Sequence, residues 1–164
     1  MRSRSILRGA YLEVFGSIKR PKKGLHVLSA HFTGIDRISS PEEYLEYIRF
    51  LKSLGTVISF QDALSYFDNK SRINKIDDCL ITLTYDDGFK ECHDVIMPVL
   101  NQEKISACFF ISPNYVDANS DYIDKYNSIV KASKRPMSWD DIVELSARGH
   151  VIGSHTLDHE DISK

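Results

Sequence analysis

One apolar run, residues 79–85 ("CLITLTY"), constrains the fold more than any other part of this chain. It is rich in β-forming residues and lacks the strict alternation of apolar and polar side chains that marks a strand with one wet face. Strands that are apolar on both faces are typical of parallel sheets covered by helices. The sequence therefore predicts that this run is a buried strand of an α/β protein.

The segments on either side of this run alternate between strand and helix patterns. Strand patterns cover residues 25–32, 56–60, 105–111 and 150–155, and helix patterns cover residues 41–54, 61–67, 89–103 and 139–148. Pro98 predicts a kink or break in the third helix, because proline lacks an N–H group. Residues 112–136 are polar and irregular, and we expect them to form a long loop. Strand–helix alternation predicts an α/β fold with parallel strands.

Two helix starts carry capping signals. Ser40 and Glu43 match the S-x-x-E capping box around Pro41, which suits the first helical position. Ser138 is placed to cap the last helix, and Asp141 stands three residues after it. Gly55 and Gly149 follow the last apolar positions of these two helices and predict their ends.

Composition narrows the class of protein. The chain has 164 residues, enough for one domain, and a net charge of −2, which argues against a nucleic-acid-binding protein. Cys79, Cys92 and Cys108 show no metal-type spacing, and their odd number argues against a disulfide framework. We interpret all three as structural thiols, which favours a reducing compartment. No run approaches the roughly 18 apolar residues of a membrane span, and no signal peptide is seen. The predicted location of the protein is therefore cytoplasmic or unknown.

Residues 1–24 differ from the remainder of the chain. They contain seven basic residues and one acidic residue, a net charge of +6, which leaves −8 for the remaining residues. Apolar side chains recur with helical period between residues 6 and 18. A basic amphipathic helix of this kind can lie on an anionic membrane. The favoured alternative is a helix that packs its apolar face on the domain.

The predicted strand 79–85 runs directly into two adjacent carboxylates, Asp86 and Asp87. A structural explanation exists for Asp87 alone, because an acidic side chain favours the start of the following helix. It explains neither the second carboxylate nor Gly88, which allows a sharp turn. In parallel α/β folds, ligands bind at the carboxyl ends of strands, where both residues fall.

A second pair of candidates follows the last predicted strand. His155 and His159 are four residues apart, and a helical turn would put both imidazoles on one face. Taken alone, the pair is more often two surface or core histidines than a metal site. Combined with one of the carboxylates, it supplies three ligands for a divalent metal and leaves room for water. The second carboxylate could then act as a base in metal-assisted hydrolysis.

These residues resemble the polysaccharide deacetylase family, carbohydrate esterase family 4 with the NodB-homology domain. "LTYDDGF" resembles its T-F-D-D-G motif, with Tyr85 in place of phenylalanine, and "SHTLDH" resembles its H-[ST]-x-x-H motif. "ISACFFI" is similar to the A-T-F-F-[IV] strand between them. "HVLSAHF" is similar to the V-L-x-Y-H-x strand of the branch that works on poly-N-acetylglucosamine-type chains. The resemblance runs from Leu25 to His159.

The resemblance implies a role for five residues. Asp86 would be the general base, and Asp87, His155 and His159 would hold the metal. Thr156 would steady the histidine loop by hydrogen bonding. Zinc suits this ligand set best, and cobalt, manganese and nickel also fit it. The implied reaction is removal of N-acetyl or similar acyl groups from an amino-sugar polysaccharide or oligosaccharide, by hydrolysis of a carbon–nitrogen bond that is not a peptide bond.

The family's later motifs, which include the general acid, would follow His159 and have no counterpart in this sequence. The chain is therefore expected to have two parts. Charge and periodicity mark residues 1–24 as a basic amphipathic segment, and the resemblance implies that residues 25–164 are the N-terminal portion of a deacetylase domain with part of a (β/α) barrel. We expect a fragment of a longer enzyme with weak or no activity by itself. The alternative is a non-catalytic metal-binding or glycan-binding remnant of the family.

The remaining histidines and two aromatic residues receive structural interpretations. His31 follows a strand end and could approach the site, although a structural role is favoured for a single histidine. No functional role is expected for His26, His93 or His150. Tyr85 and Trp139 are expected to have packing roles, with stacking on a sugar as the alternative for either.

Overall fold

The computed structural model describes residues 21–33, 40–67, 75–131 and 133–159. The predicted N-terminal helix, and with it the proposed membrane contact through residues 6–18, lies outside these residues. The described elements, in chain order, are β1 (Gly24–Ala30), α2 (Pro41–Leu54), β2 (Thr56–Val57), α3 (Phe60–Phe67), β3 (Cys79–Tyr85), η1 (Cys92–Ile96), α5 (Met97–Gln102), β4 (Cys108–Ile111), η2 (Pro113–Tyr115), α6 (Ser120–Val130), α7 (Trp139–Ala147) and β5 (Val151–Ser154).

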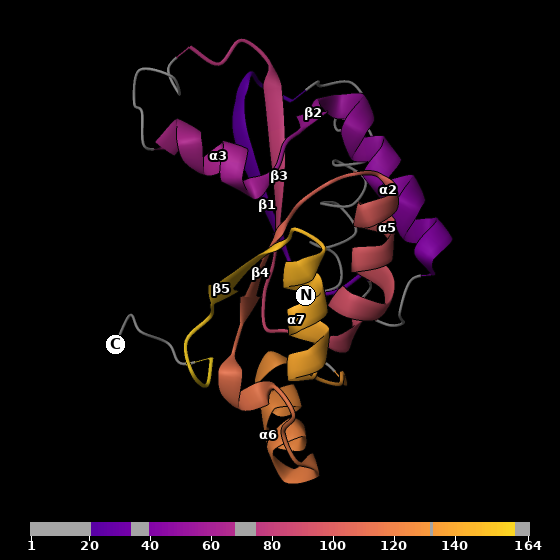
Figure 1. The fold of residues 1–164 in the computed structure, drawn as a ribbon, viewed down its shortest axis with the longest axis vertical. Helices are drawn as coiled ribbons and strands as arrows, with labels where there is room; N and C mark the ends of the chain where they lie inside the picture. The colour runs from indigo at the N-terminus through magenta and orange to yellow at the C-terminus, as the bar shows by residue number, and fades with distance from the viewer. Residues whose placement is uncertain (1–20, 34–39, 68–74, 132, 160–164) are drawn as a thin grey trace, which may run out of the picture.

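These strands form one sheet in which every pairing is parallel. The order is β1-β3-β4-β5, and β2 pairs with the first half of β3. Helices α2, α5 and α7 lie on one side of the sheet and α3 on the other (Figure 1). The predicted parallel α/β arrangement is confirmed.

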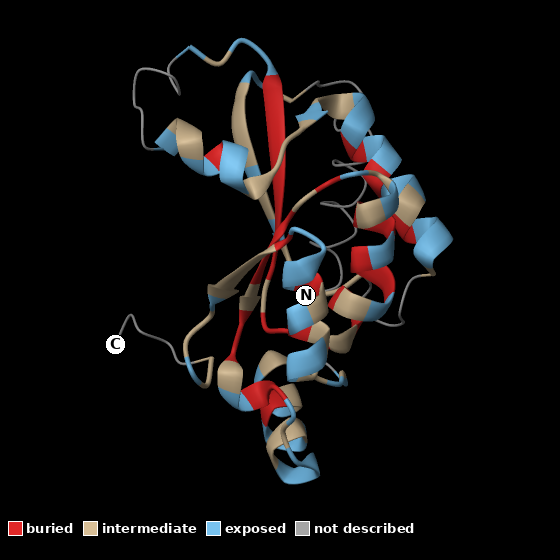
Figure 2. Ribbon diagram, viewed as in Figure 1, coloured by how far each residue is buried: buried red, intermediate tan, exposed pale blue. Residues whose placement is uncertain are grey.

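β3 is the centre of the sheet and the most buried strand. All seven of its residues are buried, as the apolar run in the sequence predicts (Figure 2). Its odd-numbered side chains, Ile81, Leu83 and Tyr85, belong to the main core with the buried stripe of α2. Its even-numbered neighbours Thr82 and Thr84 are buried but stand outside that cluster. A strand covered on both faces fixes the position of whatever follows its last residue.

The predicted helix caps are confirmed. The Ser40 side chain accepts a hydrogen bond from the Glu43 N–H group, and Glu43 in turn accepts one from the Ser40 N–H group. Ser138 and Asp141 make the same reciprocal pair at the start of α7. Gly149 ends α7 with a φ of 88°, a left-handed conformation that glycine adopts without penalty.

Three sequence expectations need correction. Residues 112–136 are not a long loop, because Asn119 caps the eleven-residue helix α6 within them. The irregularity expected at Pro98 is a π-helical turn, η1, that ends two residues before the proline. The strand expected at residues 56–60 shortens to β2, since Phe60 already begins α3. α6 has an apolar stripe as pronounced as that of α2, and it was missed because the polar residues around it dominate the composition of residues 112–136.

The carboxyl ends of the four longer strands meet at one edge of the sheet. Register pairs Ala30 with Tyr85 at the ends of β1 and β3, and Ile111 with Ser154 at the ends of β4 and β5. The residues that follow these ends, His31, Asp86, Ser112 and His155, are therefore brought to the same edge.

Two predictions from the composition concern the cysteines and membrane-spanning helices. Cys79, Cys92 and Cys108 are free and buried, in agreement with the structural interpretation. Among the described residues, no helix is both long and apolar enough to cross a membrane.

Gly55 is a position where backbone packing leaves no room for a side chain. A Cβ atom there would lie 2.3 Å from the Cys79 carbonyl oxygen and 2.7 Å from its Sγ. We expect Gly55→Ala to lower the free energy of unfolding by about 1–3 kcal/mol, because α2 and β3 would have to move apart. Ser146→Ala on the exposed face of α7 is the control. Chemical denaturation measures both, and equal stability of the two variants would contradict the expectation.

His150 should make the stability of the fold depend on pH. Burial lowers the pKa of His150 to about 4, below the ordinary value near 6.5. Its Nδ1 accepts a hydrogen bond from the Ala107 N–H group, and its Nε2 has no partner among the described residues. The unfolded chain therefore binds the proton more tightly than the folded chain, and stability falls as the pH drops from about 6.5 to 4.

The linkage amounts to roughly 3 kcal/mol over that interval. We expect His150→Asn, which keeps a side-chain acceptor, to have a flatter dependence of the melting temperature on pH between 6.5 and 4. Thermal melts at half-unit pH steps measure the difference. Parallel curves for the variant and the parent chain would show that His150 does not carry this dependence.

Candidate active site

Asp87 is the centre of the candidate site. It stands two residues after β3 in a left-handed conformation, with a φ of 76°, and Gly88 follows with a φ of 87°. These two residues turn the chain sharply from the strand into the next helix. Asp87 is fully buried, and neither of its carboxylate oxygens has a hydrogen-bond donor among the described residues. A buried carboxylate in this condition is costly, and in native proteins it is usually compensated by a cation or a donor.

The two predicted histidines approach this carboxylate. His155 Nε2 lies 3.4 Å from Asp87 Oδ1, and His159 Nε2 lies 3.5 Å from the same oxygen. Their rings are 5.1 Å apart between centroids. The chain between these two histidines is not helical. Residues 156–158 form a turn in which Thr156 and His159 adopt left-handed conformations, with φ of 61° and 55°.

The histidine turn is fastened to the segment after β4. The His155 N–H group donates to the Ile111 carbonyl at 2.8 Å, and Ser112 Oγ donates to the His155 carbonyl at 3.2 Å. Asp158 accepts hydrogen bonds from Asn114 Nδ2 at 2.9 Å and from the Tyr122 hydroxyl of α6. The positive φ of Thr156 costs energy for a β-branched residue, and such strain persists where surrounding contacts impose it. Contacts on both sides of the turn thus hold the imidazoles toward Asp87.

The three side chains fit a divalent metal ion. Asp87, His155 and His159 each offer a ligand atom, and these atoms lie within 4.8 Å of one another. Tetrahedral zinc with bonds of about 2.1 Å would space its ligand atoms about 3.4 Å apart. The distances from Asp87 Oδ1 to the two Nε2 atoms, 3.4 and 3.5 Å, match that spacing. The unpartnered buried carboxylate gives a second, independent reason to expect a cation here.

Asp86 has a different environment from Asp87. It is only half-buried, and its Oδ2 accepts a hydrogen bond from Ser29 Oγ on β1 at 2.8 Å. Its backbone N–H group donates to the Ala30 carbonyl at 2.9 Å, which extends the β1–β3 ladder by one bond. The two adjacent carboxylates therefore have different surroundings. Asp87 is buried beside the histidines, and Asp86 is hydrogen-bonded to the edge strand β1.

His31 lies closer to the site than the sequence interpretation favoured. Its Nε2 is 3.9 Å from Asp87 Oδ2, the oxygen other than the one that the two predicted histidines approach. His31, Phe32, Asp87, Val130 and His159 line a cavity of about 280 Å³. The one signal in the sequence was the position of His31 just after a predicted strand end.

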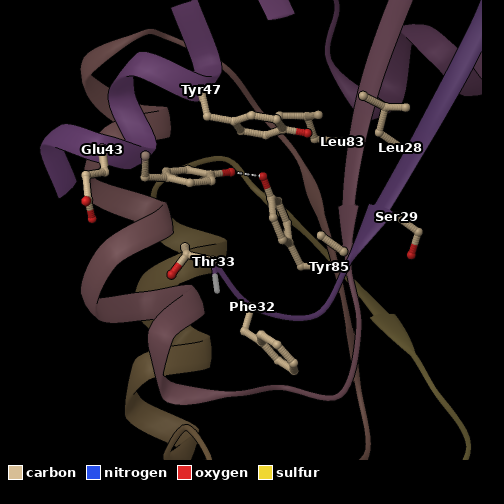
Figure 3. Close-up of a pocket in the computed structure, with 10 residues that line it drawn as sticks. Leu28, Ser29, Phe32, Thr33, Glu43, Tyr47, Leu83 and Tyr85 are labelled. Carbon is tan, nitrogen blue, oxygen red and sulfur yellow. Dashed lines mark hydrogen bonds between the residues drawn. The ribbon is translucent and has the colours of Figure 1, made fainter. Parts of the chain in front are cut away.

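A second cavity lies beside the site on the α2 side of the sheet. It has a volume of about 250 Å³, and the side chains of Tyr47, Leu83 and Tyr85 surround it (Figure 3). The hydroxyls of Tyr44 and Tyr85 are hydrogen-bonded to each other at its wall. Tyr85 also stacks on Phe109 with centroids 5.0 Å apart, so its predicted packing role is confirmed.

Trp139, His150 and His93, for which no catalytic or metal-binding role was expected, lie in different environments. Trp139 was expected to have a packing role, but 51% of it is exposed at the start of α7. His150 is buried against Phe109, with ring centroids 5.3 Å apart. His93 bridges Asp94 and Glu144 at 2.8 and 3.1 Å, away from the metal ligands.

Comparison with protein families matches residues 74–164, more than half of the chain, to the polysaccharide deacetylase model. The chain belongs to the polysaccharide deacetylase family. The match includes both motifs around the candidate site. The resemblance seen in the sequence is confirmed at the level of the family, and so is the partial (β/α) barrel with parallel strands.

Individual deacetylases are similar over part of their length. A chitin deacetylase from Colletotrichum lindemuthianum is 33% identical over 84 residues, which cover 51% of this chain and 28% of that protein. The structure of IcaB from Ammonifex degensii is 26% identical with a TM-score of 0.66, covering 84% of this chain and 55% of that one. The Streptococcus pyogenes deacetylase PplD, solved with acetate, shares the fold at 15% identity and a TM-score of 0.60. The chain therefore covers between 28% and 61% of the length of these three relatives.

Loss of the Asp87 carboxylate should abolish metal-linked stabilisation. Zinc at 100 times its Kd stabilises a folded protein by about 2.7 kcal/mol. We expect zinc to raise the melting temperature of the parent chain by several degrees and that of Asp87→Asn not at all. Asparagine tolerates the left-handed backbone, so the variant should fold.

The control is Asp140→Asn, which removes an exposed carboxylate at the start of α7 and should keep the full response to zinc. Differential scanning fluorimetry on chelator-treated protein, with and without zinc, measures all three chains. An Asp87→Asn response as large as that of the parent would exclude Asp87 as a metal ligand.

Proposed function

We propose that this chain carries the metal-binding and water-activating part of a deacetylase that removes N-acetyl groups from an amino-sugar glycan. The observation that carries the proposal is the buried, unpartnered Asp87 carboxylate, 3.4 and 3.5 Å from two imidazole nitrogens at the carboxyl edge of the sheet. Family membership supports the reaction class, and the chitin deacetylase relative supports an N-acetylated polysaccharide as the substrate.

Asp87, His155 and His159 would hold a divalent ion, with zinc favoured by one carboxylate and two imidazoles. When bound, such an ion polarises an acyl carbonyl and lowers the pKa of water. Asp87 contributes a buried negative charge on a rigid strand end, which keeps the ion in place without rearrangement. The histidine turn contributes two imidazole ligands, and the hydrogen bonds of the His155 backbone with Ile111 and Ser112 hold this turn in place.

Asp86 would act as the general base. The hydrogen bond from Ser29 Oγ occupies one lone pair of its Oδ2 and orients the carboxylate while leaving acceptor capacity for a proton from water. The partly exposed position of Asp86 gives water access, whereas Asp87 is sealed. Water attack on the N-acetyl carbonyl breaks the carbon–nitrogen bond, and acetate and the free amine are the products. The amine needs a proton donor, and we assign none among the described residues.

Acetate release separates the hydrolase from a non-catalytic binding module. We expect the parent chain, loaded with zinc, to release acetate slowly from N-acetylglucosamine oligomers, because the leaving amine lacks an assigned acid. Asp86→Asn should lower that rate by 10²-fold or more, a typical contribution of a general base, while zinc content stays unchanged.

Zinc analysis and an enzymatic acetate assay on the same samples measure both quantities. Ser128→Ala on the exposed face of α6 is the control for nonspecific loss. Full zinc binding without any acetate release would contradict catalysis by this chain itself and favour the metal-binding or glycan-binding remnant.

A further inference from the structure

Glu91 and Lys134 form a buried ion pair next to the candidate site. Glu91 lies in the first turn of the helix that follows Asp87, and Lys134 lies between α6 and α7. The side chains are 4% and 8% exposed, and Lys134 Nζ contacts Glu91 Oε1. Neither residue belongs to the motifs that identify the family, nor to the candidate metal ligands.

Both members of the pair also contact the segment that follows β1. The Thr33 N–H group and the Thr33 hydroxyl both donate to Glu91 Oε2, each at 3.1 Å. Lys134 Nζ lies 4.6 Å from the centre of the Phe32 ring, within the range of a cation–π contact. Phe32 in turn packs edge-on against Phe89 at 5.6 Å between centroids. Two consecutive residues of the segment are therefore fixed by this one ion pair.

The fixed segment carries His31 to Asp87. The His31 side chain is 47% exposed, so packing around the ring does little to hold it, and its place depends on the backbone of residues 31–33. A weak hydrogen bond from Cys92 Sγ to the His31 carbonyl, at 3.7 Å, adds a third attachment of this backbone to the same helix. The result is the 3.9 Å approach of His31 Nε2 to Asp87 Oδ2.

Stability alone gives a poor reason for an ion pair at this place. Removing two charges from water costs several kcal/mol for each ion, and apolar side chains of similar volume often replace a buried pair without loss of stability. The carboxylate of Glu91 does what an apolar residue would not, because it accepts two directed hydrogen bonds from Thr33 while its charge is neutralised by Lys134. The pair is therefore better suited to fixing geometry than to adding free energy of unfolding.

We infer that Glu91, neutralised by Lys134, is a positioning residue that holds His31 beside Asp87 Oδ2 and so strengthens metal binding by Asp87. The inference rests on the metal centre proposed above. Mutation of a residue that orients a metal-binding side chain typically lowers metal affinity 10- to 100-fold. Because Glu91 acts on metal binding through His31, its effect can be distinguished experimentally from a general loss of stability.

The main test replaces both partners with apolar residues of similar size, in the variant Glu91→Leu with Lys134→Met. We expect this variant to melt within a few degrees of the parent chain and to bind zinc about tenfold more weakly. His31→Ala should weaken zinc binding by a similar factor. The triple variant should bind zinc no more weakly than His31→Ala alone, because without His31 the pair has nothing to position. Competition with a chromogenic zinc chelator measures the four affinities.

The matched control removes a second ion pair far from the site, between α2 and α5. Lys52 Nζ and Glu103 Oε2 are 2.7 Å apart, and Lys52→Met with Glu103→Leu should leave zinc affinity unchanged. Thr33→Val serves as a second test, because it keeps the ion pair and removes one hydrogen bond to Glu91. We expect it to fold like the parent chain and to lose two- to threefold in zinc affinity.

Each outcome decides a separate point. Unchanged zinc affinity in the folded Glu91→Leu, Lys134→Met variant would overturn the inference, and so would losses that simply multiply with that of His31→Ala. If this variant does not fold, unchanged affinity in Thr33→Val overturns it instead. Failure of the parent chain to bind zinc, or full binding by Asp87→Asn, would refute the metal centre itself and not only the role of Glu91.

Discussion

The position of the Asp87 carboxylate at the end of a fully buried strand is the constraint on which the rest of the site depends. β3 is covered on both faces, so the two residues after it have little freedom, and the chain turns through left-handed Asp87 and Gly88 into the next helix. This turn buries a negative charge that no described donor satisfies. Burial of that charge is tolerable when a cation shares the site, which is why the histidine turn and the carboxylate make physical sense only together.

Parallel topology accounts for how such distant parts of the sequence meet. The turn of residues 155–159 follows β5, two strands away from β3, yet the register of β4 brings both strand ends to one edge. The hydrogen bond from His155 to Ile111 and that from Ser112 to the His155 carbonyl then fasten the turn to β4. The same edge also receives Asp86, through Ser29 of β1, and His31. The candidate site is thus formed by the ends of several strands rather than by any one segment.

Much of this was readable from the sequence. Three features were predicted correctly: the seven-residue buried strand, the capping boxes at Ser40 and Ser138, and the alternation of strands and helices. Each is encoded by residues that are close together in the sequence, so it can be recognised without knowledge of tertiary contacts. α6 was missed although its apolar residues recur with helical period, because the polar composition of the whole segment 112–136 was taken as the signal of a loop. The exposure of Trp139 escaped because side-chain burial depends on which neighbours cover a helix, and no local pattern reports them.

The sequence by itself determined the α/β class, the family, and the identity of the acidic pair and the histidine pair as candidates, since these follow from residue types at fixed spacing. The resemblance in the sequence already implied that Asp87 lies with the histidines, and the tertiary structure supplied the physical reason, because the left-handed turn after the strand buries Asp87 and leaves Asp86 half-buried. Only the tertiary structure decided that His31 reaches Asp87 and that Glu91 and Lys134 hold the loop that carries it. Contacts between residues 43 or more positions apart exist only after the sheet has brought them together.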